Sequence, residues 1–364
     1  MEDVKTPYRD VTNQPTSWTE TLAGDNYNLA GITAVRNVGL FTGDASANKT
    51  RERYKVGGTD LGIPVVHNDK LYLFFGDTFG GDDAGNPMGG GLWRSNVLAY
   101  TEDRDFADGL QLDGFIIGSG MFENQAIELI GSKKIPGIEH TVIPTGAISV
   151  NGNIYSYFMS VKEWGDPGRW MINYGGLAKS EDDGQTFRAL KEIELDPDRF
   201  GQVSPILIDD MIYFIGIGGG RFGDAYLMRV APEQIESLDA YEYFAGTDEN
   251  GEPQFSADVN DSVAVADGPV GEPAIMYNEY LEEYIISYLD EQRAAIVMRV
   301  AKQPWGPYSE KLDMIRSADY PALYGGFVHD ALIANEGQTI YFTMSMWDPI
   351  YNSILFEVEL DRKP

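Results

Sequence analysis

Five segments of this chain share one pattern of apolar and polar positions: a β-rich apolar run, a short polar turn, and a second apolar run containing tyrosine or phenylalanine. Two such runs joined by a tight turn predict a β-hairpin. The copies lie about 60 to 80 residues apart, which is enough for one four-stranded sheet and its loops. Sheets that recur in this way bury their faces by stacking, so the pattern predicts an all-β fold, a five-bladed β-propeller. The copies begin near Thr59, Ile143, Gln202, Gly271 and Phe327.

The second copy contains signals for a whole blade. Asn151 and Gly152 separate its first two predicted strands, and Asn-Gly between β-rich runs strongly favours a hairpin. A third predicted strand at residues 170–179 is followed by residues 180–187, SEDDGQTF. This segment resembles the Asp-box turn between the third and fourth strands of sialidase-type propeller blades. We therefore expect a structural role, in which Asp182 accepts backbone N–H groups inside the turn and Phe187 packs inward.

We expect one closed domain with an extension at its start. Residues 1–28 are polar and without periodicity, and they are expected to wrap the surface, while residues 29–364 form the predicted propeller. The β-rich run 29–40 is expected to pair with the run SILFEVEL at residues 353–360, because this pairing closes the ring and removes two open sheet edges. The one passage with a helical pattern is short, at residues 231–238.

Charge and composition narrow the choice of partner. The 57 acidic and 27 basic residues give a net charge of −30, and such a field repels nucleic acid. The chain has no cysteine, which excludes disulfides and thiolate metal sites. No apolar stretch approaches the roughly 20 residues that span a bilayer. We therefore expect a monomer that acts on a neutral partner, with no nucleic acid, no membrane and no cofactor.

The start of the sequence leaves the location open. Its first ten residues, MEDVKTPYRD, lack the basic region and apolar core of a secretory signal. We expect a cytoplasmic protein, or a secreted or periplasmic one from which a signal has been removed.

Residues 80–91, GGDDAGNPMGGG, predict a long loop that forms a lid or lip at a pocket rim. The spacing of Asp82 and Asp83 fits no regular calcium-binding loop. Whether a metal binds there or in the central channel stays open. His67 is expected in a solvated turn.

Carboxylates are the catalytic groups in ample supply. The chain has three histidines and no cysteine, and it contains neither a G-x-S-x-G nor an H-E-x-x-H motif. Asp60 precedes the first strand of the first copy, and Asp77 follows the second strand. Because these strands form a hairpin, both side chains are expected at one end of the blade. A pair of carboxyl groups, one protonated and one ionised, is what glycoside cleavage requires. The alternative is structural: Asp60 caps a turn and Asp77 binds loop amides.

Other polar side chains at the starts of the copies, and aromatic side chains near strand ends, are expected around the same pocket. Sugars pack their C–H faces on aromatic rings and form hydrogen bonds through their hydroxyl groups. The expected substrate-binding residues are Trp93, Arg94, Asn96, His140, Trp170, Asn173, Gln202, Glu272, His329 and Trp347. For any single tryptophan or histidine, a packing role is the alternative.

Several of these segments together resemble glycoside hydrolase family 183. The segments are TDLG, GDTFGG, WRSNVLA, EHTVIPTGAI, NYGGLAKSEDDGQTF, VSPI, GEPAIM and FVHDALI, and the resemblance covers about residues 30 to 360. It implies a five-bladed propeller that acts as an endo-D-arabinanase on the arabinogalactan and lipoarabinomannan of mycobacteria. It also implies inversion at the anomeric carbon by an aspartate pair that matches Asp60 and Asp77. We assign Asp77 as the general acid and Asp60 as the general base.

Two other classes of function stay open. One is another propeller glycosidase, acting on L-arabinan, fructan or a sialoside. A sialidase, however, needs an arginine cluster, and arginines are sparse at the starts of the copies. The other is a carbohydrate-binding propeller without catalysis. The residues at the copy starts differ from one copy to the next, which favours a single asymmetric site over repeated lectin sites.

Overall fold

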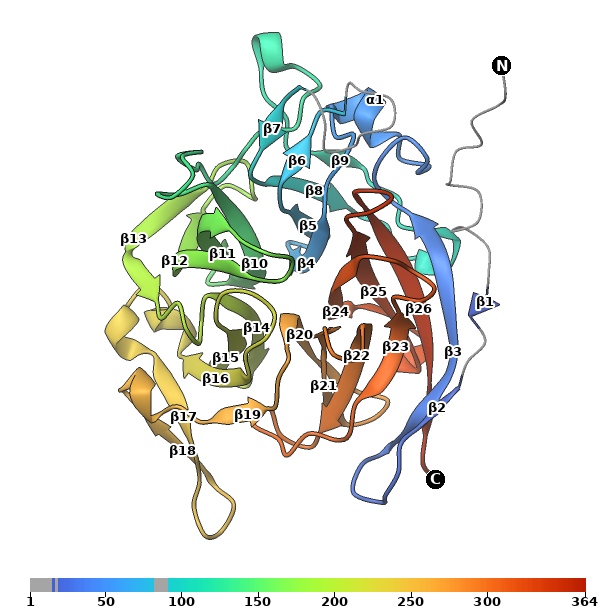
Figure 1. Cartoon of the computed structure of the whole chain (residues 1–364), viewed down its shortest axis with the longest axis vertical. Helices are drawn as coiled ribbons and strands as arrows, with labels where there is room; N and C mark the ends of the chain where they lie inside the picture. Colours follow the sequence, from blue (N-terminus) through green and yellow to red (C-terminus); the bar gives the residue numbers. More distant parts are fainter. Residues whose placement is uncertain (1–14, 17–18, 82–90) are drawn as a thin grey trace.

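The computed structural model describes residues 15–16, 19–81 and 91–364. Over these residues the chain forms the five-bladed β-propeller that the repeat pattern predicted (Figure 1). Five antiparallel sheets stand around a central axis, and four of them follow one another along the chain. The fifth sheet combines strands from both ends of the described chain.

The innermost strand of each blade lines the axis. These strands are β4 (Leu61–His67), β10 (Thr141–Val150), β14 (Gln202–Ile208), β20 (Gly271–Asn278) and β24 (Leu323–Ala334). They contact one another in this order and β24 contacts β4, so the ring is closed. Residues at their starts line one cavity and residues toward their ends line another, so all five run in one direction along the axis.

In blades 1 to 4 the outer strands follow the inner strand in order along the chain. Blade 1 adds β5 (Lys70–Phe75), β8 (Val97–Thr101) and β9 (Gly114–Phe115), and a separate ribbon pairs β6 (Thr78–Phe79) with β7 (Trp93–Arg94). Blade 2 adds β11 (Asn153–Trp164), β12 (Trp170–Ser180) and β13 (Arg188–Leu195). Blade 3 adds β15 (Met211–Ile217), β16 (Ala225–Val230), β17 (Glu242–Thr247), β18 (Pro253–Ser256) and β19 (Ala264–Ala266). Blade 4 adds β21 (Glu283–Asp290), β22 (Ala295–Ala301) and β23 (Leu312–Arg316).

Blade 5 closes the ring with strands from distant parts of the sequence. After β24 come β25 (Thr339–Met346) and β26 (Asn352–Arg362), and β26 pairs with β3 (Leu29–Leu40). The short strands β1 (Pro15–Thr16) and β2 (Glu20–Thr21) pair with β3. The predicted pairing of the early and late β-rich runs is therefore confirmed. It is reinforced by an ion pair between Arg36 of β3 and Glu357 of β26.

The Asp-box segment joins β12 to β13, as the sequence predicted. The Asp182 carboxylate accepts hydrogen bonds from the backbone N–H and the hydroxyl of Thr186 and from the Ser180 hydroxyl. Phe187 packs edge-on against Phe74 of blade 1, with ring centroids 5.5 Å apart. The turn therefore helps to hold neighbouring blades together.

Two local predictions were wrong. His67 is 3% exposed, and its ring nitrogens form hydrogen bonds with Ser149 and Asp183 of blade 2, so it joins two blades. Residues 231–238 contain no α-helix; short 3-10 turns lie at Pro232–Gln234 and Leu238–Ala240. The α-helix in the described part of the chain is α1 (Thr50–Tyr54). The other 3-10 turns are Phe106–Asp108, Gly120–Phe122, Val259–Asp261 and Asn335–Gly337.

Inner strands are irregular where they begin. The register shifts between Leu61 and Ile63 in β4, between Pro144 and Gly146 in β10, between Gly271 and Ala274 in β20, and between Tyr324 and Phe327 in β24. Such bulges bend a strand and redirect its side chains, and they are frequent beside active sites. No helix in the described residues is long and apolar enough to span a membrane.

Candidate active site

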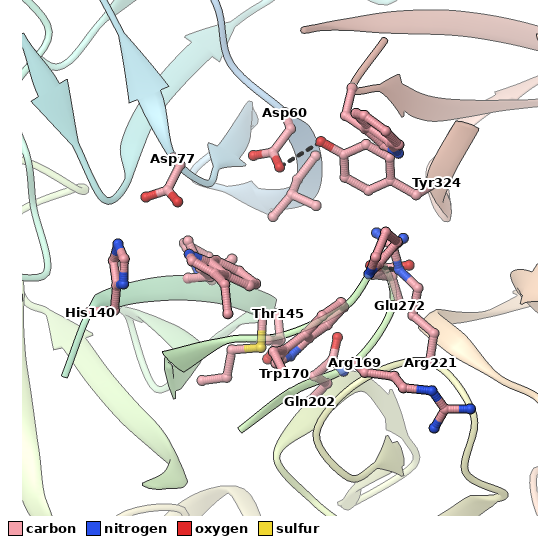
Figure 2. Close-up of a pocket in the computed structure, with 18 of the residues that line it drawn as sticks. Asp60, Asp77, His140, Thr145, Arg169, Trp170, Gln202, Arg221, Glu272 and Tyr324 are labelled. Carbon is pink, nitrogen blue, oxygen red and sulfur yellow. Dashed lines mark hydrogen bonds and ion pairs between the residues drawn. The ribbon is translucent and has the colours of Figure 1, made fainter. Parts of the chain in front are cut away.

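A cavity of about 650 Å³ opens where the inner strands begin. Residues at or near the start of every inner strand contribute to the wall of this cavity, including Asp60, Thr145, Gln202, Glu272 and Tyr324. Figure 2 shows Asp60 and Asp77 along one wall, with Trp170 and Gln202 facing them. Closure of the ring therefore brings together residues that lie far apart in the sequence.

Asp60 is held by tyrosines of blade 5. The Tyr324 hydroxyl donates a 2.8 Å hydrogen bond to Asp60 Oδ2. Asp60 Oδ1 is buried and accepts no hydrogen bond from the described residues. Burial raises the pKa of Asp60 to about 7; the hydroxyl of Tyr324 opposes this rise, as does that of Tyr351, and the negative charge of Asp77 adds to it.

Asp77 follows β5 after Gly76 and is held by Trp93 of blade 1 and Thr141 of blade 2. Its Oδ1 accepts hydrogen bonds from the indole N–H of Trp93 at 2.8 Å and from the hydroxyl of Thr141 at 2.7 Å. Burial raises the pKa of Asp77 to about 6, and these two hydrogen bonds oppose the rise. Neither bond uses Oδ2, which is left available to a substrate.

Two glycines make room for the charged side chains. A Cβ atom at Gly76 would lie 2.5 Å from Asp60 Oδ1, and one at Gly271 would lie 2.8 Å from Cγ of Arg221. Both separations are far shorter than a real contact. A side chain at either position would therefore displace the charged group beside it.

A buried ion pair forms part of the facing wall. The Arg221 Nε–H donates a 2.7 Å hydrogen bond to Glu272 Oε1, and the two side chains are only 11% and 9% exposed. The Arg221 guanidinium also lies 5.2 Å from the ring centroid of Trp170 and 4.8 Å from that of Tyr324. Burial raises the pKa of Glu272, and the charge of Arg221 opposes the rise. Glu272 has a positive φ of 42°, so its backbone is strained at the bulge that begins β20.

Aromatic side chains cover much of the remaining wall. Trp93 stacks on Phe79 and meets His140 edge-on, and the Lys134 ammonium lies 4.0 Å from the Trp93 ring centroid. Trp170 meets Trp164 edge-on across the β11–β12 hairpin, whose tip at residues 165–169 also lines the cavity. The cavity is therefore largely apolar, with Asp60 and Asp77 on one side.

Most of the residues predicted from the sequence line this cavity. They are Asp60, Asp77, Trp93, His140, Trp170, Gln202, Glu272 and Trp347. Gln202 also braces the wall, because its amide N–H groups donate to the carbonyls of Gly218 and Gly220.

Four predicted substrate-binding residues do not line the cavity. Arg94 is buried and donates to the carbonyls of Ala126 and Lys55. Asn96 is buried, and its amide binds backbone groups of Leu129, Ile130 and Val142. Both side chains satisfy the backbone of the long connection between blades 1 and 2.

Asn173 and His329 are the other two. Asn173 donates to the carbonyl of Ile138 and to the hydroxyl of Ser160. His329 lies at the opposite mouth of the axial channel, where its Nδ1 lies 2.7 Å from a carboxylate oxygen of Asp330. The irregular start of β24 explains this error, because the pocket end of that strand is at Tyr324, several residues before His329.

Sequence reasoning missed Tyr324 and Tyr351, which lie against Asp60, and Arg221, which pairs with Glu272. Tyr324 and Tyr351 come from blade 5, and Arg221 comes from the loop between β15 and β16. Their types are common, and no local pattern marks them. Thr141 had a signal: it begins the second inner strand beside the predicted residue His140.

Metal binding finds no support in the described part of the chain, which contains no group of three or more histidine or acidic residues that could hold an ion. The predicted loop at residues 80–91, with Asp82 and Asp83, lies largely outside the described residues.

The chain is similar to several known proteins. It is 28% identical over 324 residues to the Notoamide biosynthesis cluster protein J of Aspergillus sp. (strain MF297-2), which covers 82% of each chain. Its structure is similar to that of a candidate hydrolase from Bacteroides ovatus ATCC 8483, with a TM-score of 0.62, 14% identity, and coverage of 89% of this chain and 90% of that chain. It is also similar to the RS223 β-xylosidase, with a TM-score of 0.52, 15% identity, and coverage of 84% and 93%.

At identities this low, similarity to a solved structure shows a shared fold. A family model, by contrast, matches most of the chain in sequence. The family described as "Domain of unknown function (DUF4185)" matches residues 45–357, and the chain therefore belongs to that family.

Proposed function

We propose that this protein is a glycoside hydrolase that cleaves internal α-D-arabinofuranosyl linkages of mycobacterial arabinan by an inverting, two-carboxylate mechanism. The observation that carries the proposal is the pair Asp60 and Asp77. Both carboxyl groups line one largely apolar cavity, and burial raises their pKa values to about 7 and about 6. Between these two pKa values, at mildly acid pH, such a pair holds about one proton, which is the state that acid–base cleavage of a glycoside needs.

The two aspartates would divide the work. Asp77 would protonate the leaving oxygen through Oδ2, which neither of its hydrogen bonds uses. Asp60 would accept a proton from the attacking water. The order of the two pKa values alone favours the reverse assignment. We keep Asp77 as the acid because both of its hydrogen bonds use Oδ1, and the pH dependence of kcat/KM in the two asparagine variants decides between the assignments.

The choice of arabinan rests on the resemblance to glycoside hydrolase family 183. The fold supports a glycosidase in general, since one similar structure is a β-xylosidase. The aromatic lining suits uncharged sugar rings. A sialoside fits less well, because two arginines line the cavity and one of them, Arg221, is already paired with Glu272.

Purified arabinogalactan provides the test. We expect release of long oligosaccharides before short ones, and an inverted anomeric product in the first minutes by proton NMR. Asp60→Asn and Asp77→Asn should each lower kcat/KM by about 100- to 10,000-fold and leave the melting temperature within a few degrees. The Asp77 variant should regain activity on an aryl arabinofuranoside with a good leaving group, which needs no acid.

Other outcomes would redirect the proposal. Activity on L-arabinan or fructan alone would keep the mechanism and change the substrate. Sugar binding without any cleavage would make the protein a carbohydrate-binding propeller. Normal turnover in either aspartate variant would remove that residue from the mechanism.

A further inference from the structure

Two tryptophans stand at the rim of the cavity with much of their side chains in solvent. Trp164 is 39% exposed and Trp347 is 45% exposed, and both line the cavity. A large aromatic side chain that remains exposed at the mouth of a pocket often marks a binding surface. Neither residue contacts Asp60 or Asp77 through a hydrogen bond or ring contact recorded for the described residues.

The positions of the two tryptophans in the ring are informative. Trp164 ends β11 of blade 2, and Trp347 directly follows β25 of blade 5. Blade 1, which carries Asp60 and Asp77, lies between these two blades, because β4 contacts both β10 and β24. A chain laid across the aspartate pair would therefore meet one tryptophan on each side of the bond that is cleaved.

The two tryptophans differ in how firmly their side chains are held by neighbouring residues. Trp164 meets Trp170 edge-on at 5.5 Å, and the Arg221 guanidinium lies over Trp170 in turn. This series of contacts leads from the rim to the buried Arg221–Glu272 pair and fixes the orientation of the hairpin. Trp347 is attached through its backbone, whose N–H donates to the carbonyl of Ala322. Its side chain makes no ring or hydrogen-bond contact recorded for the described residues.

We propose that Trp164 and Trp347 are two separate platforms, on opposite sides of the aspartate pair, each of which stacks a sugar unit beyond the two that flank the cleaved bond. This inference rests on the proposed hydrolysis of a polysaccharide and adds the reason for cleavage inside the chain. Stacking uses the apolar C–H face of a sugar, so it suits a neutral chain and needs no charged group. Trp164 binds the more strongly, because its orientation is already fixed.

The first experiment compares a short and a long oligosaccharide substrate, and the short one is the internal control. Initial rates are compared on the shortest D-arabino-oligosaccharide that the wild type cleaves and on one at least four units longer. We expect Trp164→Ala to raise KM for the longer substrate about 10-fold, with kcat unchanged, and to leave kcat/KM for the short substrate within about 2-fold. Trp347→Ala should give a smaller rise of the same kind. Equal losses on both substrates, or no loss on either, would overturn the proposal.

A second experiment measures binding without hydrolysis. Native gels that contain D-arabinan, xylan or galactan are run with proteins that carry the wild-type or the substituted tryptophans, all in an Asp77→Asn background that prevents cleavage; the strong negative charge gives good mobility. We expect retardation of the wild type and about 10-fold weaker retardation of Trp164→Ala. Tyr277→Ala is the control, because Tyr277 is 38% exposed and lies on β20 outside the residues that line the cavity.

The two experiments separate the two proposals. Retardation by xylan or galactan alone, lost in the tryptophan variants, would contradict the arabinan substrate and support the platforms. Cleavage of arabinan with unchanged behaviour of both tryptophan variants would support the enzyme and overturn the platforms. A wild type that none of the three polysaccharides retards would also overturn the platforms.

Discussion

Asp60 and Asp77 are buried carboxyl groups, and each lies beside hydrogen-bond donors that make its burial tolerable. Each accepts hydrogen bonds from neutral donors, and no arginine or lysine of the described residues forms an ion pair with either of them. Without such a cation, burial dominates and both pKa values rise. The folded protein therefore holds these protons more tightly than the unfolded chain does.

This difference makes a prediction about stability and pH. The pKa of Asp60 is about 7 in the folded protein and 3.8 as its ordinary value, so its contribution to stability is complete below about pH 4 and is lost as the pH rises through 7. An asparagine does not titrate. We therefore expect Asp60→Asn to gain about 4 kcal/mol relative to the wild type between pH 4 and pH 8, as measured by urea unfolding.

Asp182→Asn is the matched control for that experiment. Hydrogen bonds from Thr186 and Ser180 lower the pKa of Asp182 below its ordinary value despite some burial. Its contribution is present above the unfolded pKa and is lost at acid pH, so this variant should lose stability relative to the wild type as the pH rises. The same sign for both variants would contradict the argument.

At the scale of single elements, the site depends on how strands begin and end. Bulges at the starts of β4, β10, β20 and β24 turn side chains toward the cavity. The end of β5 has a comparable role, since Gly76 lies between the strand and Asp77 and leaves space for Asp60. Gly76 has no positive φ, so glycine is needed there because it has no side chain that would contact Asp60.

Gly76→Ala should therefore separate activity from stability. The added methyl group would displace the Asp60 carboxyl group and break its alignment with Tyr324. We expect kcat to fall at least about 100-fold, because a misplacement of about 1 Å in a catalytic group has this effect.

The melting temperature of Gly76→Ala should drop only a few degrees. Gly131→Ala is the control, since a Cβ atom there meets no atom within 4 Å. Full activity of Gly76→Ala would show that the position of Asp60 is not critical.

The fold was predictable because its signals are local. Apolar runs and turn residues predict each hairpin from a short stretch of sequence. Asn151-Gly152 and the Asp-box form turns where the sequence predicted them. The aspartate pair was predictable within blade 1, where the hairpin brings Asp60 and Asp77 together, and Gln202 and Glu272 were predictable from the starts of their copies. Tyr324 and Tyr351 reach Asp60 through closure of the ring, which no local pattern describes. His329 was misplaced because a bulge shifts the start of β24.

At the scale of the whole molecule, blade 5 determines whether the ring closes. β3 pairs with β26 along most of its length and supplies buried side chains such as Leu29, Ile32 and Val35. Glu283 of blade 4 also accepts hydrogen bonds from the backbone of Asn28 and Leu29. Without β3, the outer edge of β26 and this apolar surface would be exposed.

A truncation series tests this dependence. A variant that begins at Thr19 keeps β3, and we expect its melting temperature to lie within a few degrees of that of the full chain. A variant that begins at Phe41 lacks β3 and should be insoluble or melt at least about 10 °C lower, since it loses a strand and exposes an edge. Cooperative unfolding of the shorter variant at the normal temperature would contradict a closing role for β3.

The pairing of β3 with β26 also has a consequence for synthesis in the cell. Arg36 and its partner Glu357 are 321 positions apart, so a ribosome makes the first of these strands long before the second. At a rate of about 5 to 20 residues per second, the nascent chain would carry an unsatisfied apolar strand for tens of seconds. Molecular chaperones that shield such strands would be expected to govern the yield of this protein more than its final stability does.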